Sequence, residues 1–514
     1  MNRLFLISLA FSLLLVSCEE EGKPSYTPRP AVSMNIISTG FHEAQVEIKS
    51  INADRTMYLL RTKGEEKGIQ VEDVIGSGQE VPSERFLISD LDDNSEYHIF
   101  AAAADASGQI SPMVKDTINT PNDPADDMVV DKPVDREEDE DGLYWWERGR
   151  SILPKFADMA LCYGGHSARN PQTWTKERFE NTAIYTDRQG QKHWFFDSML
   201  MLEIWDDNYK VTYSVANDGK KSSTKSHWNR LLDYWFSNSS TGFQALEDCI
   251  AENAAKIGTP PAPRYIVFSL PDPVYFENYK AGASGTNGNT VYWGTIDGQV
   301  MDFSRMDHRL KAYQWYIDEV RERFAQEDYK YIQLLGFYIL SETLTMKGGW
   351  RYEYKQHEEL IPMVADYCHE HNEGLYWIPY SVSDSDRDHN KALQNWKNFG
   401  FDLAILQPNY YWEDKSWSVT CDYINRYDMG MELEFEGTHG GHTSILGDSA
   451  SAKNNKARFR EYMENAKTYK IYGKKPLVLY TGTNALYELA TSEKTADREL
   501  YHEFGEFIIN SPLK

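Results

Sequence analysis

The sequence predicts an α/β protein in which a (β/α)8 barrel, of the TIM-barrel type, follows a small all-β domain. Three observations support this fold class. Short alternating stretches fill residues 28–121, an acidic stretch follows them, and eight short apolar stretches alternate with amphipathic helical patterns over residues 143–514. A chain of 514 residues is long enough for two or more domains, one of them with a substantial core.

The N-terminus has the pattern of a bacterial secretory signal. Arg3 precedes an apolar run over residues 4–16, and Leu15-Val16-Ser17-Cys18 forms a lipobox. The run of 13 residues is short for a membrane span, which needs about 20. We expect residues 1–18 to be the signal peptide and lipobox, with a lipid on Cys18 as the only membrane anchor; an ordinary signal peptide is the alternative. Glu19-Glu20-Glu21 resembles the surface-export signal of Bacteroides-type lipoproteins, which implies the outer face of the outer membrane.

The first domain is expected over residues 28–121. Val32, Met34 and Ile36 share one face of a first strand, and Val46 and Ile48 share one face of a second.

A polar corner and a tyrosine precede the next apolar stretch of this domain. Leu91-Asp92-Asp93-Asn94-Ser95-Glu96-Tyr97 resembles the tyrosine corner of a fibronectin type III sandwich, and Asp105-Ala106-Ser107-Gly108 is typical of the turn before the last strand. The resemblance implies a fibronectin type III-like module that serves as a spacer or a glycan contact.

The charge of the chain excludes one class of partner. A formal net charge of −26 argues against nucleic acid, whose phosphates need basic patches. Part of this charge lies in residues 123–141, where ten acidic residues face only Lys132 and Arg136. We interpret residues 122–142 as a solvated linker. The four cysteines after Cys18 lack the paired spacing of a zinc or redox site, so we expect buried free thiols.

The barrel prediction rests on strands that alternate with helices. Four apolar stripes at helical spacing are expected to face the core; they include Trp228 with Leu231, Tyr313 with Ile317, Phe459 with Tyr462, and Tyr501 with Phe504. An open doubly wound sheet would show a Gly-rich phosphate loop after its first strand, and the sequence has none. No cofactor is expected. The eight candidate strands are residues 159–163, 194–196, 265–270, 334–340, 375–378, 403–406, 431–435 and 477–480.

Acidic residues occur at two of the predicted strand ends. The fourth strand ends at Ser341-Glu342, and the seventh contains Glu432, Glu434 and Glu436 at a spacing of two. At this spacing the three glutamates lie on one face, and the apolar residues between them are suited to pack under the helices. Several buried acids in one strand carry a large desolvation cost, which favours a functional role. Glu432, the deepest, is more easily explained as the partner of a buried Arg or Lys.

A glutamate after strand four and another on strand seven resemble the catalytic pair of retaining glycoside hydrolases with this barrel. By that resemblance Glu342 is the acid/base, with a raised pKa, and Glu434 is the nucleophile, with Glu436 as the competing candidate. Their carboxyls should then lie about 5 to 5.5 Å apart, against about 6.5 to 9.5 Å in an inverting enzyme. The sequence departs from the larger clan at Ser341, where Asn is usual.

The other strand ends are rich in groups that suit sugars. Carboxylate, amide and imidazole groups can hydrogen-bond hydroxyls, and Tyr and Trp faces can cover apolar C–H patches. Any one of them could instead be structural, as Asp197 and His166 illustrate. The candidates for substrate binding are His166, Asp197, Asp272, Tyr338, Tyr380, Gln407, Asn409, Tyr410, Trp412 and Tyr480.

Several motifs resemble a family of uncharacterised Bacteroides-type surface lipoproteins that is grouped with barrel glycoside hydrolases. They are Trp194-Phe195-Phe196-Asp197, Trp293-Gly294-Thr295-Ile296-Asp297-Gly298, Gly336-Phe337-Tyr338 with Glu342, and the Glu432/Glu434 strand. Asp297-Gly298 with Asp302 lacks the ligand spacing of a calcium loop, so no metal is expected.

Three functions follow as alternatives. The leading hypothesis is a surface glycosidase that hydrolyses O-glycosyl bonds of a polysaccharide or glycoconjugate. The second is a glycan-binding protein that keeps the aromatic groove without cleavage, and the third is an adhesive surface protein.

Overall fold

The computed structural model describes residues 29–40, 43–89, 91–121, 156–167, 173–214, 221–236, 240–274, 292–347, 355–383, 387–482 and 484–514. The predicted signal with Cys18 and the predicted linker over residues 122–142 lie outside these residues. In the described part of the chain, no helix has the length and apolar character needed to cross a membrane.

The N-terminal all-β region is a β-sandwich, as predicted. In one sheet the strand order is β1 (Ala31–Thr39), β2 (Ala44–Ile51), β5 (Arg85–Ile88). The other sheet has the order β4 (Gln79–Glu80), β3 (Arg55–Thr62), β6 (Glu96–Ala104), β7 (Val114–Asn119), and helix α1 (Val71–Ser77) precedes β4. Val46 and Ile48 are both buried, and the side chain of Asp105 closes the expected turn by accepting from the backbone N–H groups of Ser107 and Gln109.

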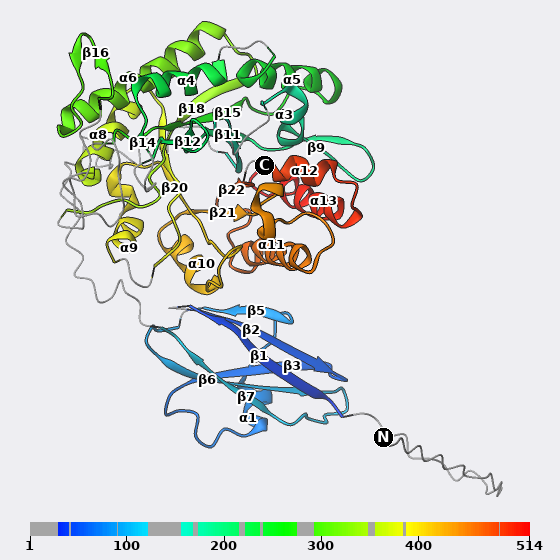
Figure 1. Cartoon of the computed structure of the whole chain (residues 1–514). Coiled ribbons are helices and arrows are strands. Elements are labelled where there is room, and N and C mark those ends of the chain that lie inside the picture. The colour runs from blue at the N-terminus through cyan, green and yellow to red at the C-terminus, as the bar shows by residue number, and fades with distance from the viewer. Residues whose placement is uncertain are drawn as a thin grey trace, which may run out of the picture. The chain divides into compact units, whose positions relative to one another are not determined.

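The second region is a closed barrel of eight parallel strands, which Figure 1 shows ringed by helices. In chain order the strands are β8 (Asp158–Tyr163), β11 (Ser198–Leu202), β15 (Arg264–Leu270), β18 (Ile332–Ile339), β19 (Gly374–Trp377), β20 (Leu403–Leu406), β21 (Gly430–Glu434) and β22 (Leu477–Tyr480). β22 pairs with β8 and closes the barrel.

Seven of the eight predicted barrel strands are confirmed, and the second is wrong. Lys192–Trp194 forms β10, which pairs antiparallel with β9 (Ile184–Thr186) outside the barrel. Phe195 and Phe196 pack on Phe504 instead of entering the sheet. The apolar run continues past Asp197, so the barrel strand is Ser198–Leu202.

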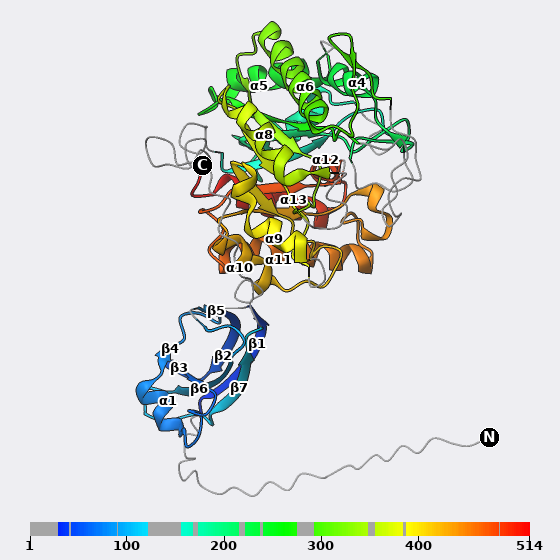
Figure 2. The ribbon, with the colours of Figure 1, turned by 90° about the vertical axis from the view of Figure 1, so that its left-hand side faces the viewer.

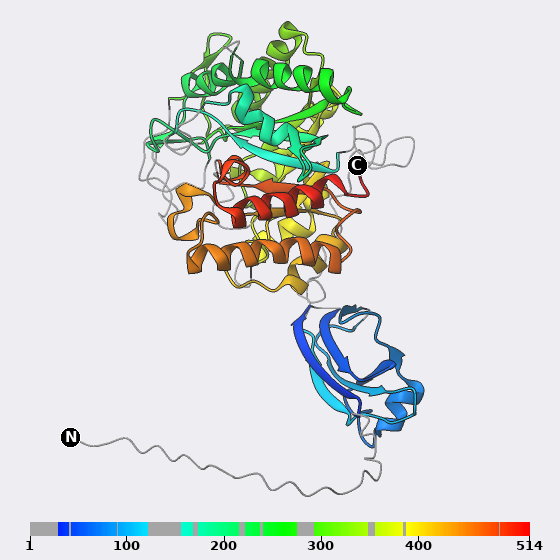
Figure 3. The ribbon, with the colours of Figure 1, turned by 90° about the vertical axis from the view of Figure 1, so that its right-hand side faces the viewer.

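The helices between the strands cover the barrel. Figure 2 shows α6 and α8 side by side, and Figure 3 shows α11 and α13 together. The helices are α3 (Lys176–Ala183), α4 (Lys225–Phe236), α5 (Gly242–Ile257), α6 (Met306–Glu327), α8 (His357–His369), α9 (Arg387–Gln394), α10 (Trp417–Arg426), α11 (Ala450–Thr468), α12 (Ala485–Thr491) and α13 (Thr495–Ile509). Short elements in the loops are β12 (Trp205–Asp206), β13 (Val211–Thr212), β14 (Lys221–Ser222), β16 (Thr295–Ile296), β17 (Gln299–Val300), and the 3-10 turns Trp396–Phe399 and Thr438–Thr443.

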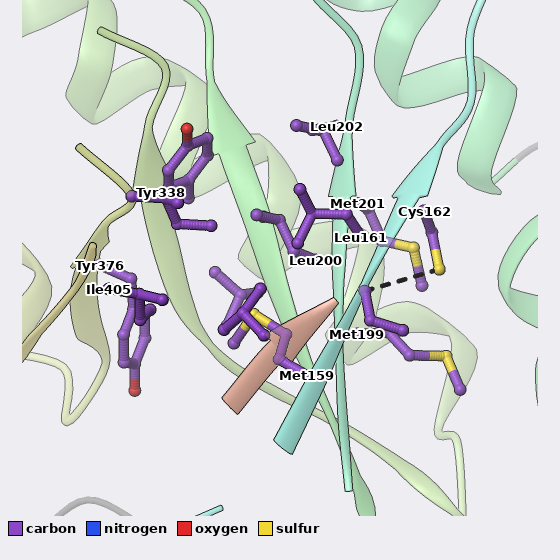
Figure 4. Close-up of a cluster of buried hydrophobic side chains, with 14 of the residues drawn as sticks. Met159, Leu161, Cys162, Met199, Leu200, Met201, Leu202, Tyr338, Tyr376 and Ile405 are labelled. Atoms are coloured by element: carbon purple, nitrogen blue, oxygen red, sulfur yellow. Dashed lines mark hydrogen bonds between the residues drawn. The ribbon is translucent and has the colours of Figure 1, made fainter. Parts of the chain in front are cut away.

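The main hydrophobic core joins the barrel strands to these helices. The four predicted helical stripes contribute to it, since Trp228, Tyr313, Phe459 and Phe504 are all buried. Figure 4 shows part of the core, with side chains from β8, β11, β18, β19 and β20. The four cysteines after Cys18 are buried free thiols, as expected.

Candidate active site

A cavity lies at the carboxyl ends of the barrel strands, where the loops of this fold build active sites. It has a volume of about 270 Å³. Every barrel strand except β15 contributes to its wall, directly or through the residues just after the strand. The lining residues are Leu161, Tyr163, Leu202, Ile204, Tyr338, Leu340, Glu342, Ile378, Tyr380, Gln407, Asn409, Trp412, Glu432, Glu434 and Tyr480.

Glu342 reaches this cavity from the loop after β18. Two hydrogen bonds to its backbone carbonyls hold this loop. Trp377 Nε1 donates to the carbonyl of Ser341 at 2.8 Å, and the backbone N–H of Tyr380 donates to the carbonyl of Glu342 at 3.2 Å. The Glu342 side chain is exposed. Its carboxyl can therefore exchange protons with solvent while its backbone stays in place.

Glu434 is the last residue of β21 and is only 1% exposed. Its Oε2 atom accepts two hydrogen bonds, from the backbone N–H of Asn409 at 2.7 Å and from the Tyr462 hydroxyl at 2.6 Å. Asn409 has a φ of 55°, a left-handed conformation that Asn tolerates better than most residues. Both donors hold the same oxygen, so the orientation of the carboxyl is fixed.

Tyr462 is brought to Glu434 by helix α11. The Ser449 hydroxyl caps the start of this helix by accepting from the Ala452 N–H at 3.0 Å. The Tyr462 hydroxyl also accepts from the Tyr411 N–H at 2.8 Å. Tyr462 was predicted only as part of a core stripe, because its spacing in the sequence gives no sign that its hydroxyl meets a strand-end acid.

Glu432 lines the same cavity two residues deeper, as the period of two predicts. It is 2% exposed, and among the described residues its Oε1 atom has no hydrogen-bond partner. The prediction of a buried Arg or Lys partner is therefore not met within the described part of the chain. A buried carboxylate without a hydrogen-bond donor has a large desolvation cost, which protonation reduces.

The electrostatics connect the three acids. Burial raises the pKa of Glu434 to about 8, the Tyr462 hydroxyl and the Asn409 N–H oppose this shift, and the nearby Glu342 adds to it. Burial also raises the pKa of Glu432 well above its usual value, and the charges of Glu434 and Glu342 add to that shift. The sequence led us to expect a raised pKa at Glu342. In the structure, burial raises the pKa of both strand acids, Glu432 and Glu434. Glu432, which lacks the donors that Glu434 has, is the better site for a proton.

Glu436 does not line the cavity, so the expectation that all three glutamates share one environment is wrong. β21 ends at Glu434, and Glu436 lies in the following loop, where it forms an isolated bridge with Ser444. Its Oε2 accepts a hydrogen bond from the Thr443 hydroxyl. The strict alternation stops where the strand pairing stops.

Six of the ten predicted sugar-binding residues line the cavity: Tyr338, Tyr380, Gln407, Asn409, Trp412 and Tyr480. Aromatic rings form one wall, where Tyr480 meets Tyr163 edge-on at 5.9 Å and Trp412 at 5.7 Å between ring centroids. The Asn409 amide donates to the Tyr380 hydroxyl at 2.9 Å, and the Gln407 amide donates to the carbonyl of Ile378 at 3.0 Å.

The other four predicted binding residues lie outside the cavity wall. Asp197 precedes β11, so its predicted place after the second strand is wrong; it sits at the opposite end of the barrel, paired with Arg264. His166 is exposed, with its ring against Tyr234.

Asp272 and Tyr410 follow their strands as predicted but are occupied by other contacts. Asp272 is buried and accepts from the hydroxyls of Tyr313 at 3.2 Å and Ser341 at 3.1 Å, which places it behind the Glu342 loop. The Tyr410 hydroxyl donates to Glu461 at 2.6 Å.

Glu203 was not identified from the sequence, because the second strand was predicted at residues 194–196. Glu203 directly follows β11 and is fully buried. It accepts from the Ser167 hydroxyl at 2.7 Å and from the Ile204 N–H at 2.8 Å. The bond from Ser167 ties the loops after the first two strands together. Extending the apolar run to Leu202 would have identified it.

Metal binding gains no support from the described residues, which contain no group of three or more His, Cys, Asp or Glu side chains placed to hold an ion. Asp297 pairs with Lys311 at 3.1 Å, and Asp302 accepts from the Ser304 hydroxyl and N–H.

The comparison with solved structures concerns the N-terminal sandwich. The FN5 domain of Drosophila Lar is 14% identical, with 18% of this chain and 96% of that chain covered and a TM-score of 0.14. The fn3 domain of human collagen alpha-1(XX) chain is 15% identical, with 20% and 94% covered and a TM-score of 0.15. The fibronectin type-III domain of human fibronectin type III domain containing protein 3 is 14% identical, with 21% and 98% covered and a TM-score of 0.14.

The barrel region matches a known protein family. No curated protein matches the chain. A domain of unknown function, DUF4855, matches residues 158–506, which spans all eight barrel strands. Since this match covers more than half of the chain, the protein belongs to the DUF4855 family.

Proposed function

We propose that the barrel is a retaining glycoside hydrolase that acts on a polysaccharide or glycoconjugate. One observation carries this proposal: Glu342, after the fourth strand, and Glu434, at the end of the seventh, line the same cavity. In the retaining barrel hydrolases that these two positions resemble, they supply the acid/base and the nucleophile. The partly exposed rings of Trp412, Tyr380 and Tyr480 support the proposal, because aromatic faces suit the C–H surfaces of sugars.

In the proposed reaction, Glu342 protonates the glycosidic oxygen while Oε1 of Glu434 attacks the anomeric carbon. The bond to the leaving group breaks as the glycosyl ester of Glu434 forms. Glu342 then takes a proton from water, whose oxygen attacks the same carbon and releases Glu434. Because Tyr462 and Asn409 both bind Oε2, the other carboxyl oxygen is left for the attack.

The test is a panel of glycans with analysis of the products, applied to the wild type and three variants. Glu342→Gln should lower the rate about 10²- to 10⁴-fold on substrates with poor leaving groups and much less on those with good ones. Glu434→Gln should abolish cleavage of both kinds. Glu436→Gln is the matched control and should keep its activity, because this side chain lies off the cavity wall.

Two further measurements test the assignment of the two acids. A trapped glycosyl-enzyme should carry the sugar on Glu434, and its structure should show the carboxyls of Glu342 and Glu434 about 5 to 5.5 Å apart. A sugar on Glu436 would move the role of nucleophile to that residue, and a separation beyond about 10 Å would overturn the retaining mechanism.

The raised pKa of Glu434 favours a second candidate, a glycan-binding protein that does not cleave. A carboxyl with a pKa of about 8 is mostly neutral at pH 7, and a neutral carboxyl is a poor nucleophile. If the panel binds but no product forms between pH 6 and pH 9, the binding function is correct and the glycosidase is not.

We also propose that the protein is an exported lipoprotein, held at the outer face of the outer membrane by a lipid on Cys18. The lipobox and the acidic residues after it support this proposal. Metabolic labelling with a fatty acid, followed by protease treatment of intact cells, tests the lipid and the surface location separately.

A further inference from the structure

The wall of the cavity has an unusual balance of charge. Three carboxyl groups line it, from Glu342, Glu432 and Glu434, and no Lys, Arg or His occurs among the described residues of the wall. The remaining polar groups are amides and phenols. A carboxylate or sulfate on a bound sugar would add negative charge beside carboxyls whose pKa values are already raised by burial and by one another, and the described residues of the wall provide no cation to offset it.

Glu432 adds an acceptor that points to a ligand. Its side chain is only 2% exposed and lines the cavity. Among the described residues its Oε1 atom has no hydrogen-bond partner. Buried carboxyl oxygens rarely lack a hydrogen-bond partner, because nothing then offsets the free-energy cost of their desolvation. A hydroxyl or an ammonium group of a ligand at this depth would supply the missing donor.

We propose that the cavity takes uncharged or amine-bearing sugars and rejects acidic ones, with Glu432 as the acceptor for a donor group of the most deeply bound sugar. This inference rests on the proposed glycan function and names its substrate class. Glu432 is then a binding residue that sets specificity, while Glu342 and Glu434 carry the reaction.

The first experiment measures binding and cleavage separately on the full chain. Short oligosaccharides of glucan, mannan, xylan, galactan and chitosan are compared with oligogalacturonate and chondroitin sulfate. Uncharged or amine-bearing glycans should bind, and oxidation of the best hexose-based ligand at C6 to carboxylates should weaken its binding about tenfold or more. Tighter binding of an acidic glycan, or no binding of any uncharged or amine-bearing one, overturns the inference. Binding of an uncharged glycan without cleavage leaves the inference standing and refutes the hydrolase.

The second experiment replaces the acceptor. Glu432→Leu keeps a similar volume and should raise the dissociation constant of the best ligand about tenfold to a hundredfold, as expected for loss of a strong hydrogen bond. Glu432→Gln keeps a polar atom and should recover part of the loss. Glu327→Gln, an exposed change on α6, is the control. Unchanged binding in a folded Glu432→Leu variant overturns the role of Glu432. If that variant does not fold, unchanged binding in Glu432→Met, which also lacks an acceptor oxygen, does so.

Discussion

Burial of Glu434 predicts that removing its charge stabilises the folded chain. An unfolded glutamate titrates near 4.5, whereas burial raises the pKa of Glu434 to about 8. Between these values the folded state keeps a proton that the unfolded state releases. The carboxyl therefore costs nothing below about pH 4.5 and destabilises the fold increasingly as the pH rises to about 8.

The magnitude follows from the size of the shift. At about 1.4 kcal/mol per pKa unit, a change from 4.5 to about 8 corresponds to about 5 kcal/mol at pH 8. In Glu434→Gln the amide oxygen can still accept from Tyr462 and Asn409, so these hydrogen bonds persist. Because Glu432 shares the repulsion, we expect the variant to be more stable by about 2 to 5 kcal/mol at pH 8, and nearly equal to the wild type at pH 4.5.

The assay is urea denaturation from pH 4.5 to pH 9, monitored by tryptophan fluorescence. All 14 tryptophans lie after residue 143, so this signal reports on the barrel region and not on the sandwich. Glu327→Gln serves as the exposed control. A Glu434→Gln variant that is no more stable than the wild type at pH 8, or whose difference in stability does not change with pH, would refute the reasoning.

Four further predictions concern activity, the anchor and the domains. On a substrate with a good leaving group, kcat/KM of Glu342→Gln should rise with pH up to about 8, because this variant no longer needs a protonated Glu342 and Glu434 must lose its proton to act as the nucleophile; a rate that instead falls from pH 6 to pH 8 would give Glu434 the role of the acid. Tyr462→Phe removes one donor from Glu434 and leaves the Tyr411 N–H unpaired, so urea denaturation should show a loss of about 1 to 3 kcal/mol and the kinetic pKa should rise. Cys18→Ala should leave a folded protein that a high-salt wash removes from membranes, and sedimentation with membranes would contradict the lipid anchor. A fragment starting near Gly142 should give a cooperative transition by itself, since the acidic linker offers little apolar surface for an interface; an insoluble fragment would argue the reverse.

The sequence by itself determined the barrel and the strand positions of its acids. Period-two spacing was sufficient to place Glu432 and Glu434 on one face, because alternation is a local property of an extended backbone. The loop after the sixth strand was identified from its place at a strand end and its polar and aromatic residues, and Gln407, Asn409 and Trp412 all line the cavity.

Only the tertiary structure decided which of these groups belong together and in what state. Glu436 leaves the cavity because pairing ends at Glu434. Asp197 lies at the far end of the barrel because it precedes β11, and the apolar residues on both sides of it hid the start of that strand in the sequence. The Tyr462 hydroxyl reaches Glu434 across 28 positions of the sequence, which no local pattern encodes. Burial raises the pKa values of the two strand acids, Glu432 and Glu434. This burial depends on how strands and helices that are distant in the chain pack around each carboxyl.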